Sequence, residues 1–215
     1  MSDILLDCGT NFCQGLQTQI NNLEIDKDWK IHCFEANPYT YAHTKNIINK
    51  NFNHLDITLH NKAVWVRNCV RKMTVEYNDQ DCLQHIATNN GFSLTDLNLN
   101  KEDAFWVGGA SNIMEENFLP TESVGQVREQ TVDVGCIDLS EFINKTFSKD
   151  DVIYIKMDIE GAEYSVLNKL IKTGAIDNVR KITIEWHNHL LKEQYDQQYL
   201  EKEIEKRGIE LIPWH

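Results

Sequence analysis

The chain has 215 residues, 41% of them hydrophobic and 25% charged, which is enough to bury the core of one globular domain without a disulfide or metal staple. Its formal net charge of −12 at pH 7 repels phosphate backbones and argues against a nucleic-acid partner. No apolar run of about 18 residues and no signal-peptide pattern is present, so we expect no membrane span and a cytoplasmic location, with the cysteines as free thiols.

The first part of the chain alternates strand and helix patterns. Residues 3–9 form a short apolar run that ends at a glycine, which is typical of a buried strand. Apolar residues then recur at helical spacing over 11–23. Further strands are predicted over 30–35 and 57–65, with a helix between them after Pro38.

The last part of the chain repeats this alternation. It predicts a central strand over 151–158, a helix over 160–172 that ends at Gly174, a strand over 181–186, a helix over 193–207 and a last strand over 209–214. Strands that alternate with helices indicate an α/β fold, with a mostly parallel sheet covered by helices on both faces.

Residues 67–134 interrupt the alternation. They include a strand pattern, a long polar segment and a second strand pattern near 130–137. We therefore predict a single domain over 1–215 with an inserted β-rich lid or substrate region over 67–134. Few residues remain for strands after 181–186, and the sheet edge left open there makes a homo-oligomer one expectation.

Two motifs that follow the first two predicted strands point to a nucleotide-type cofactor. In DCGTN, the acid Asp7 precedes Gly9, which lets the backbone turn toward a ligand at a helix N-terminus. A dinucleotide fold requires G-x-G-x-x-G here, but this chain has only Gly9 and Gly15. The acid instead suits a cationic ligand such as S-adenosylmethionine. In FEANP, Glu35 is placed to accept hydrogen bonds from both ribose hydroxyls.

The chain resembles the FkbM-type S-adenosylmethionine-dependent methyltransferases, of the Rossmann-like class I fold. The blocks DCGTN, FEANP, VGCIDLSEF and IKMDIEGAEYSVL occur in order and are followed by ITIEWH. The resemblance implies methyl transfer to oxygen of a sugar-containing or other small hydroxylated acceptor. Cys13 stands where the family usually has a glycine, and its Cβ leads us to expect a displaced loop. The cofactor-binding residues that the resemblance implies are Asp7, Gly9, Thr10, Asn11, Glu35 (at the ribose), Ala36 and Ala63 (near the adenine).

Acidic side chains gather where the predicted strand 151–158 passes into a helix. Methyl transfer to a hydroxyl uses a base for its proton, and clustered carboxylates raise at least one pKa. The candidate catalytic residues are Asp158, Glu160, Glu163 and His187. No metal ligand is assigned, but the same side chains offer an alternative, a divalent cation (Mg²⁺ or Mn²⁺) that polarises the hydroxyl. The plainer alternative for Glu160 and Glu163 is that acids are favoured at a helix start.

Two other functions remain open from the sequence. A catalytically degenerate Rossmann-like module that binds a partner is one, and Cys13 is its main support. An NAD-dependent oxidoreductase is the other, and the missing G-x-G-x-x-G argues against it. S-adenosylmethionine and a small-molecule or glycan-type acceptor are the expected ligands.

Overall fold

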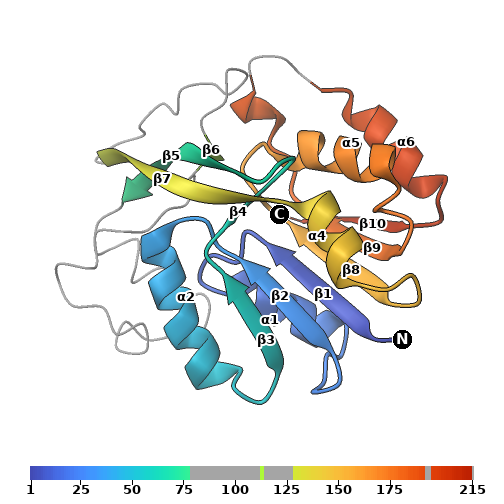
Figure 1. The fold of residues 1–215 in the computed structure, drawn as a ribbon, viewed down its shortest axis with the longest axis horizontal. Helices are drawn as coiled ribbons and strands as arrows, with labels where there is room; N and C mark the ends of the chain where they lie inside the picture. Colours follow the sequence, from blue (N-terminus) through green and yellow to red (C-terminus); the bar gives the residue numbers. More distant parts are fainter. Residues whose placement is uncertain (78–111, 114–127, 192–194, 215) are drawn as a thin grey trace.

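The computed structural model describes residues 1–77, 112–113, 128–191 and 195–214, built around a six-stranded sheet (Figure 1). Its order is β10-β9-β8-β1-β2-β3, and every neighbouring pair is parallel. The chain runs outward from β1 to one edge and then returns to β8, on the other side of β1. Such a reversal is where α/β sheets bind ligands, beyond the carboxyl ends of the strands. The strands are β1 (Asp3–Cys8), β2 (Lys30–Phe34), β3 (Asp56–His60), β8 (Val152–Met157), β9 (Val179–Ile184) and β10 (Glu210–Pro213).

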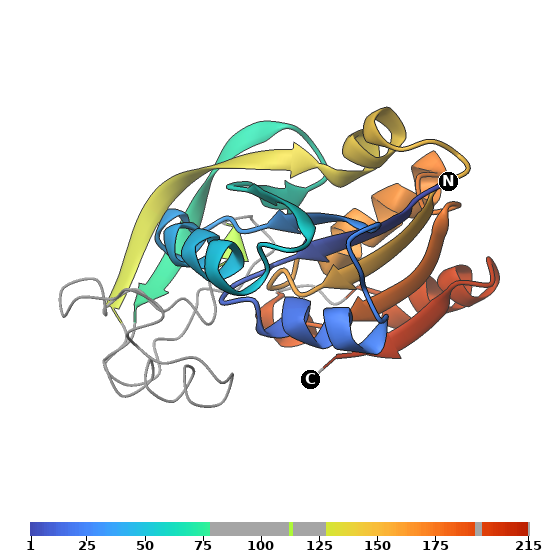
Figure 2. The same cartoon turned by 90° about the horizontal axis from the view of Figure 1, so that it is seen from below.

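Helices cover both faces of this sheet (Figures 1 and 2). α1 (Gln14–Asn22) and α2 (Pro38–Asn51) pack on one face, and α4 (Leu139–Thr146), α5 (Glu163–Thr173) and α6 (Gln197–Glu205) form a layer on the other. The predicted fold class, a parallel sheet between helical layers, is confirmed. Among the described residues, no helix is long and apolar enough to cross a membrane.

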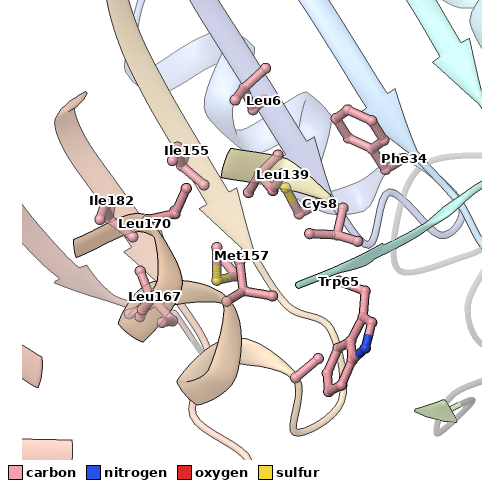
Figure 3. Close-up of a cluster of buried hydrophobic side chains, with 14 of the residues drawn as sticks. Leu6, Cys8, Phe34, Trp65, Leu139, Ile155, Met157, Leu167, Leu170 and Ile182 are labelled. Atoms are coloured by element: carbon pink, nitrogen blue, oxygen red, sulfur yellow. The ribbon is translucent and has the colours of Figure 1, made fainter. Parts of the chain in front are cut away.

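Alternation along β1 divides its side chains between two cores. Leu6 points into the larger core, which includes Leu139 of α4 and Leu167 of α5 (Figure 3). Leu5 points the other way, toward Leu16 of α1 in the smaller core. Because both faces are buried, the strand reads as a continuous apolar run, as a central parallel strand does.

A second sheet lies beside the first and has the order β4-β7-β5-β6. β5 and β7 pair antiparallel from Cys69↔Cys136 to Tyr77↔Arg128, and β4 pairs parallel with β7. The described part of the segment 67–134 is therefore β-rich. The remainder of this segment, residues 78–111 and 114–127, lies outside the described residues. Its role as a lid stays a prediction. The strands are β4 (Ala63–Trp65), β5 (Cys69–Tyr77), β6 (Asn112–Ile113) and β7 (Arg128–Asp138).

Two local expectations were wrong, and one helix was missed. The strand predicted over 57–65 is divided into β3 and β4, which belong to different sheets. The helix expected from Glu160 begins at Glu163, and Glu160 lies before it with a positive φ of 54°. α4 was not predicted, although Asp138 caps it by accepting a hydrogen bond from the Glu141 amide.

Candidate active site

The loop after β1 requires glycine at its first position. Gly9 has φ 81°, and a Cβ there would lie 1.8 Å from the carbonyl oxygen of Asp158. The Gly9 and Thr10 amides both donate to the Phe34 carbonyl at 3.0 Å, which ties the loop to the end of β2. The backbone of this loop therefore sits against the end of β8, where a side chain at residue 9 would not fit.

Cys13 occupies a backbone conformation that favours glycine. Its φ of 66° and ψ of 13° are left-handed, and its side chain is fully buried in the smaller core. A non-glycine residue in this conformation carries a penalty of about 1 kcal/mol. The loop thus accommodates Cys13 and still leads directly into α1.

A cleft opens above the carboxyl ends of β1, β2 and β8, and the first residues of β4 also line it. One part of its wall is apolar and the rest carries carboxylates and amides, as in many small-molecule sites. The structure brings five of the seven expected cofactor-binding residues into this wall, and their contact with a cofactor stays a prediction. The lining residues are Gly9, Asn11, Phe34, Glu35, Ala36, Asn37, Lys62, Ala63, Val64, Met73, Asp158, Ile159 and Glu160.

Glu35 is held at the end of β2 by the backbone. Its Oε2 accepts a hydrogen bond from the Asn11 amide and its Oε1 accepts one from the Asn37 amide, both at 2.8 Å. Burial raises the pKa of this carboxyl to about 7, against the lowering effect of those two amides. Each oxygen keeps a second lone pair, so the group remains able to accept from ribose hydroxyls.

Asp7 and Thr10 are not brought into the cleft. Asp7 has no exposed surface, and Thr10 Oγ1 donates to the Asp7 carbonyl at 3.1 Å. The Asp7 carboxylate lies 3.9 Å from Nζ of Lys156, another buried residue, and burial raises the pKa of Asp7. These two residues lie behind the loop and support it, and they are not part of the cleft wall, so their contact with a cofactor stays a prediction.

Lys156 was missed by the sequence analysis and connects the loop to the acids. Its Nζ donates to the Gly9 carbonyl at 2.8 Å and to Asp158 Oδ2 at 3.1 Å. Burial would lower its pKa, but the Asp7 and Asp158 carboxylates outweigh this effect and raise it, so the ammonium stays charged. A Cβ on Gly15 would approach Lys156 Cε to 2.7 Å, so Gly15 leaves the room that this side chain needs. A lysine within the apolar run IYIKM was the available signal.

Glu163 is a structural carboxylate. It has no exposed surface, and it accepts hydrogen bonds from the Ile159 amide at 2.8 Å and the Gly161 amide at 2.9 Å. Its Oε1 also contacts Nδ1 of His187 at 2.9 Å. Glu163 therefore shapes the turn between β8 and α5 and orients His187, and it does not reach the cleft. Its hydrogen bonds favour a positioning role, and the catalytic role expected from the sequence stays a prediction.

The remaining acids surround the other nitrogen of His187. Its Nε2 lies 3.7 Å from Glu160 Oε2, 3.7 Å from Glu185 Oε1 and 4.0 Å from Asp158 Oδ1. Asp158 and Glu185 follow the ends of the neighbouring strands β8 and β9, which explains their proximity. Glu185, near the end of the strand predicted over 181–186, was not among the candidate catalytic residues.

The crowding of acids changes the proton affinity of this site. Burial, and then the neighbouring carboxylates, raise the pKa of Glu160 to about 8, while His187 acts to lower it. Burial lowers the pKa of His187, but the hydrogen bond that its Nδ1 donates to Glu163 and the surrounding carboxylates outweigh this effect and raise the pKa to about 9. Glu160 and His187 therefore hold their protons more tightly than free carboxyl and imidazole groups do.

The sequence matches the family described as the methyltransferase FkbM domain over residues 7–211. The chain belongs to this family. The methyltransferase FkbM from Methylobacillus flagellatus KT, a solved structure, aligns over 82% of this chain and 30% of its own, with 15% sequence identity and a TM-score of 0.40. This chain thus spans less than a third of that protein's length. No curated protein matches the sequence.

Proposed function

We propose that the protein is an S-adenosylmethionine-dependent O-methyltransferase that acts on a hydroxyl of a sugar-containing or other small hydroxylated acceptor. The observation that carries this proposal is the placement of Glu35 and the Gly9 loop in one cleft with the rim acids Asp158 and Glu160. The family supports methyl transfer as the chemistry.

The lining residues fit the proposed cofactor. Asn11 lines the cleft, and its buried Oδ1 has no hydrogen-bond partner among the described residues, so it is available to a ligand donor. Glu35 would accept from the ribose hydroxyls, and the apolar side chains Ala63, Val64 and Met73 would pack against the adenine. When bound, the cofactor supplies an electrophilic methyl group on a sulfonium.

The rim acids would act on the acceptor. Asp158 Oδ2 already accepts a hydrogen bond from Lys156, so this oxygen is engaged within the protein. The Glu160 carboxylate has no such ammonium partner among the described residues, so we assign to it the removal of the hydroxyl proton. A positive φ at Glu160 sets the direction of its side chain from the turn.

The net charge of the protein and the carboxylates at the rim support this acceptor class. A net charge of −12 disfavours nucleic acids, while carboxylates at the rim suit hydroxyl donors. The NAD alternative has no support from the loop after β1, where Gly9 and Gly15 do not form a dinucleotide motif.

Isothermal titration with S-adenosylmethionine, S-adenosylhomocysteine and NAD tests the proposal. We expect the first two to bind and NAD to leave no heat of binding. Replacement of Glu35 by Ala should cost roughly 2–4 kcal/mol of affinity for S-adenosylhomocysteine, as two hydrogen bonds to a charged group are lost. Failure of both adenosyl ligands to bind the wild-type protein would overturn the proposal.

A further inference from the structure

Three ligand-type side chains meet at the rim of the cleft. Asp158, Glu185 and His187 each offer one atom, and these atoms all lie within 4.8 Å of one another. They come from the ends of β8 and β9, which pair along their length, so the sheet itself fixes their spacing. Carboxylate oxygens and an imidazole nitrogen are common ligands of divalent metal ions.

His187 is oriented for this role by a buried carboxylate. Glu163 Oε1 accepts from Nδ1 at 2.9 Å, and its own position is set by the Ile159 and Gly161 amides. Because Nδ1 is engaged by Glu163, Nε2 is the nitrogen that faces the other acids, and its lone pair is open to an ion that displaces the Nε2 proton. A histidine held through its second nitrogen by a carboxylate is a recurrent arrangement behind metal ligands.

The Nε2 atom has no hydrogen-bond partner in the described part of the chain, although His187 is only 5% exposed. Its nearest acidic oxygens, on Glu185 and Glu160, are 3.7 Å away, and Asp158 Oδ1 is at 4.0 Å. A hydrogen bond between these groups would measure about 2.7–2.9 Å. The observed separations are too long for one.

The same separations fit ligands that share an ion. With bonds of about 2.0–2.2 Å, two ligands of one metal lie between about 3 Å (adjacent) and about 4.3 Å (opposite) from each other. The distances from Nε2 to Glu185 Oε1, 3.7 Å, and to Asp158 Oδ1, 4.0 Å, fall in this interval. The oxygens of Asp158 and Glu185 lie within 4.8 Å of each other as well.

Carboxylates outnumber cationic side chains around His187, which favours the binding of a cation. Four carboxylates, those of Asp158, Glu160, Glu163 and Glu185, surround one imidazole. Among the described residues, Lys156 is the one ammonium in contact with the group, and it binds Asp158 through Oδ2. Oδ1 of Asp158 is left facing His187, on the side where an ion would be shared.

We propose that Asp158, Glu185 and His187 bind one divalent metal ion, with Glu163 as the residue that orients His187. One imidazole with two carboxylates favours Mn²⁺ over Mg²⁺ and Ca²⁺, because the latter two prefer oxygen ligands alone. Glu160 is outside this set and keeps its place in the cleft wall. A role for the ion in polarising the acceptor hydroxyl rests on the proposed methyl transfer, whereas its binding does not.

Electron paramagnetic resonance of Mn²⁺ tests the site directly. The full chain is stripped with EDTA, desalted and titrated with Mn²⁺, and the loss of the free-ion signal gives the bound fraction. We expect one Mn²⁺ per chain, displaced only by a large excess of Mg²⁺ or Ca²⁺. The weakest calcium sites of proteins have dissociation constants of about 1 mM. Absence of bound Mn²⁺ at a free Mn²⁺ concentration of about 1 mM would therefore overturn the proposal.

Single substitutions assign the ligands. Glu185→Gln is the first choice because its side chain is partly exposed and tolerates replacement, and His187→Gln and Glu163→Gln follow. Each should weaken Mn²⁺ binding about 10–100-fold or more. Glu205→Gln makes the same chemical change on an exposed position of α6 and should leave binding unchanged. Far-ultraviolet circular dichroism checks that each variant is folded.

Two outcomes separate this site from the proposed function. Mn²⁺ bound equally well by the wild type, Glu185→Gln and His187→Gln would place the ion elsewhere and overturn the metal site. Titration with S-adenosylhomocysteine in EDTA reports on the cofactor cleft independently, because Glu35 and Asn11 are not in the metal group. Cofactor binding without metal binding would reject only the inference made here.

Discussion

At the residue scale, the two rim acids Asp158 and Glu160 differ in their partners. Asp158 is tied to Lys156, whereas Glu160 lies in the cleft wall without an ammonium partner in the described part of the structure. If Glu160 is the base, Glu160→Gln should lower turnover at least ~100-fold, the lower end for losing general base catalysis. Cofactor affinity should change less than about tenfold, or ~1.4 kcal/mol. Methyl transfer assays and titration with S-adenosylhomocysteine give the two numbers.

Glu205→Gln serves as the control for this substitution, since it removes a carboxylate on exposed α6 surface. Normal turnover in Glu160→Gln would show that Glu160 is only part of the turn before α5.

A second prediction concerns the contribution of the buried Asp7–Lys156 ion pair to stability. Lys156→Met removes the cation from the fully buried Asp7 and should lower the free energy of unfolding by about 3–5 kcal/mol. The double variant Asp7→Asn, Lys156→Met removes both charges and should recover part of this loss. Urea unfolding of the single and double variants measures the coupling. Strictly additive effects would contradict a buried Asp7–Lys156 interaction.

The sequence predicted where the strands end better than it predicted the direction of each side chain. Strand ends place Glu35, Asp158 and Glu185 at one rim because parallel strands share their carboxyl edge. The rule carries no information about which side of the turn a side chain takes. In the structure, Asp7 lies behind the loop, and the carboxylate of Glu163 accepts hydrogen bonds from two backbone amides.

At the element scale, the loop between β1 and α1 contains several residues with positive φ angles. Cys13 is left-handed and buried, so Cys13→Gly relieves backbone strain but loses the packed thiol, whereas Cys13→Ala loses the thiol alone. We expect the Gly variant to be more stable than the Ala variant by about 1 kcal/mol. Thermal or urea unfolding of the pair provides the comparison. Equal stability would indicate that the conformation is not strained.

The sequence predicted the helices and strands that have a strong local apolar periodicity. It did not predict the limits of strands that depend on pairing with a distant segment. The alternation of apolar runs with helical patterns was enough for β1, β2, β8 and the helices α1 and α5. α4 was missed although Asp138 and Glu141 have the spacing of a capping box. The division of 57–65 into β3 and β4 follows from β4 pairing with β7, a contact far along the chain that no local pattern contains.

At the scale of the whole molecule, stability should depend on the ionisation of Glu35. Its pKa rises from 4.5 to about 7 on folding, because it is buried. The folded state therefore binds this proton more tightly, and the free energy of unfolding should fall by roughly 3 kcal/mol as the pH rises from about 4.5 through about 7.

Glu35→Gln has no proton to lose and is the matched control. Urea unfolding of both proteins at about pH 5 and about pH 8 isolates the contribution, because the other titrating groups are shared. We expect the wild type to lose more stability than the variant over this interval. Identical losses would contradict an elevated pKa at Glu35.

The global architecture was predictable because one rule covers most of it. Strand–helix alternation requires parallel strands with helices on both faces, and the sheet order β10-β9-β8-β1-β2-β3 agrees with that requirement. The second sheet was not predicted as a separate layer, since β5 and β7 join segments that the sequence separates widely.

A crystal structure with S-adenosylhomocysteine tests the central claim most directly. We expect the ribose hydroxyls within about 3 Å of the Glu35 carboxylate, and the sulfur on the side of the cleft that carries Asp158 and Glu160. Adenosyl density outside this cleft, or a sulfur directed away from those two carboxylates, would contradict it.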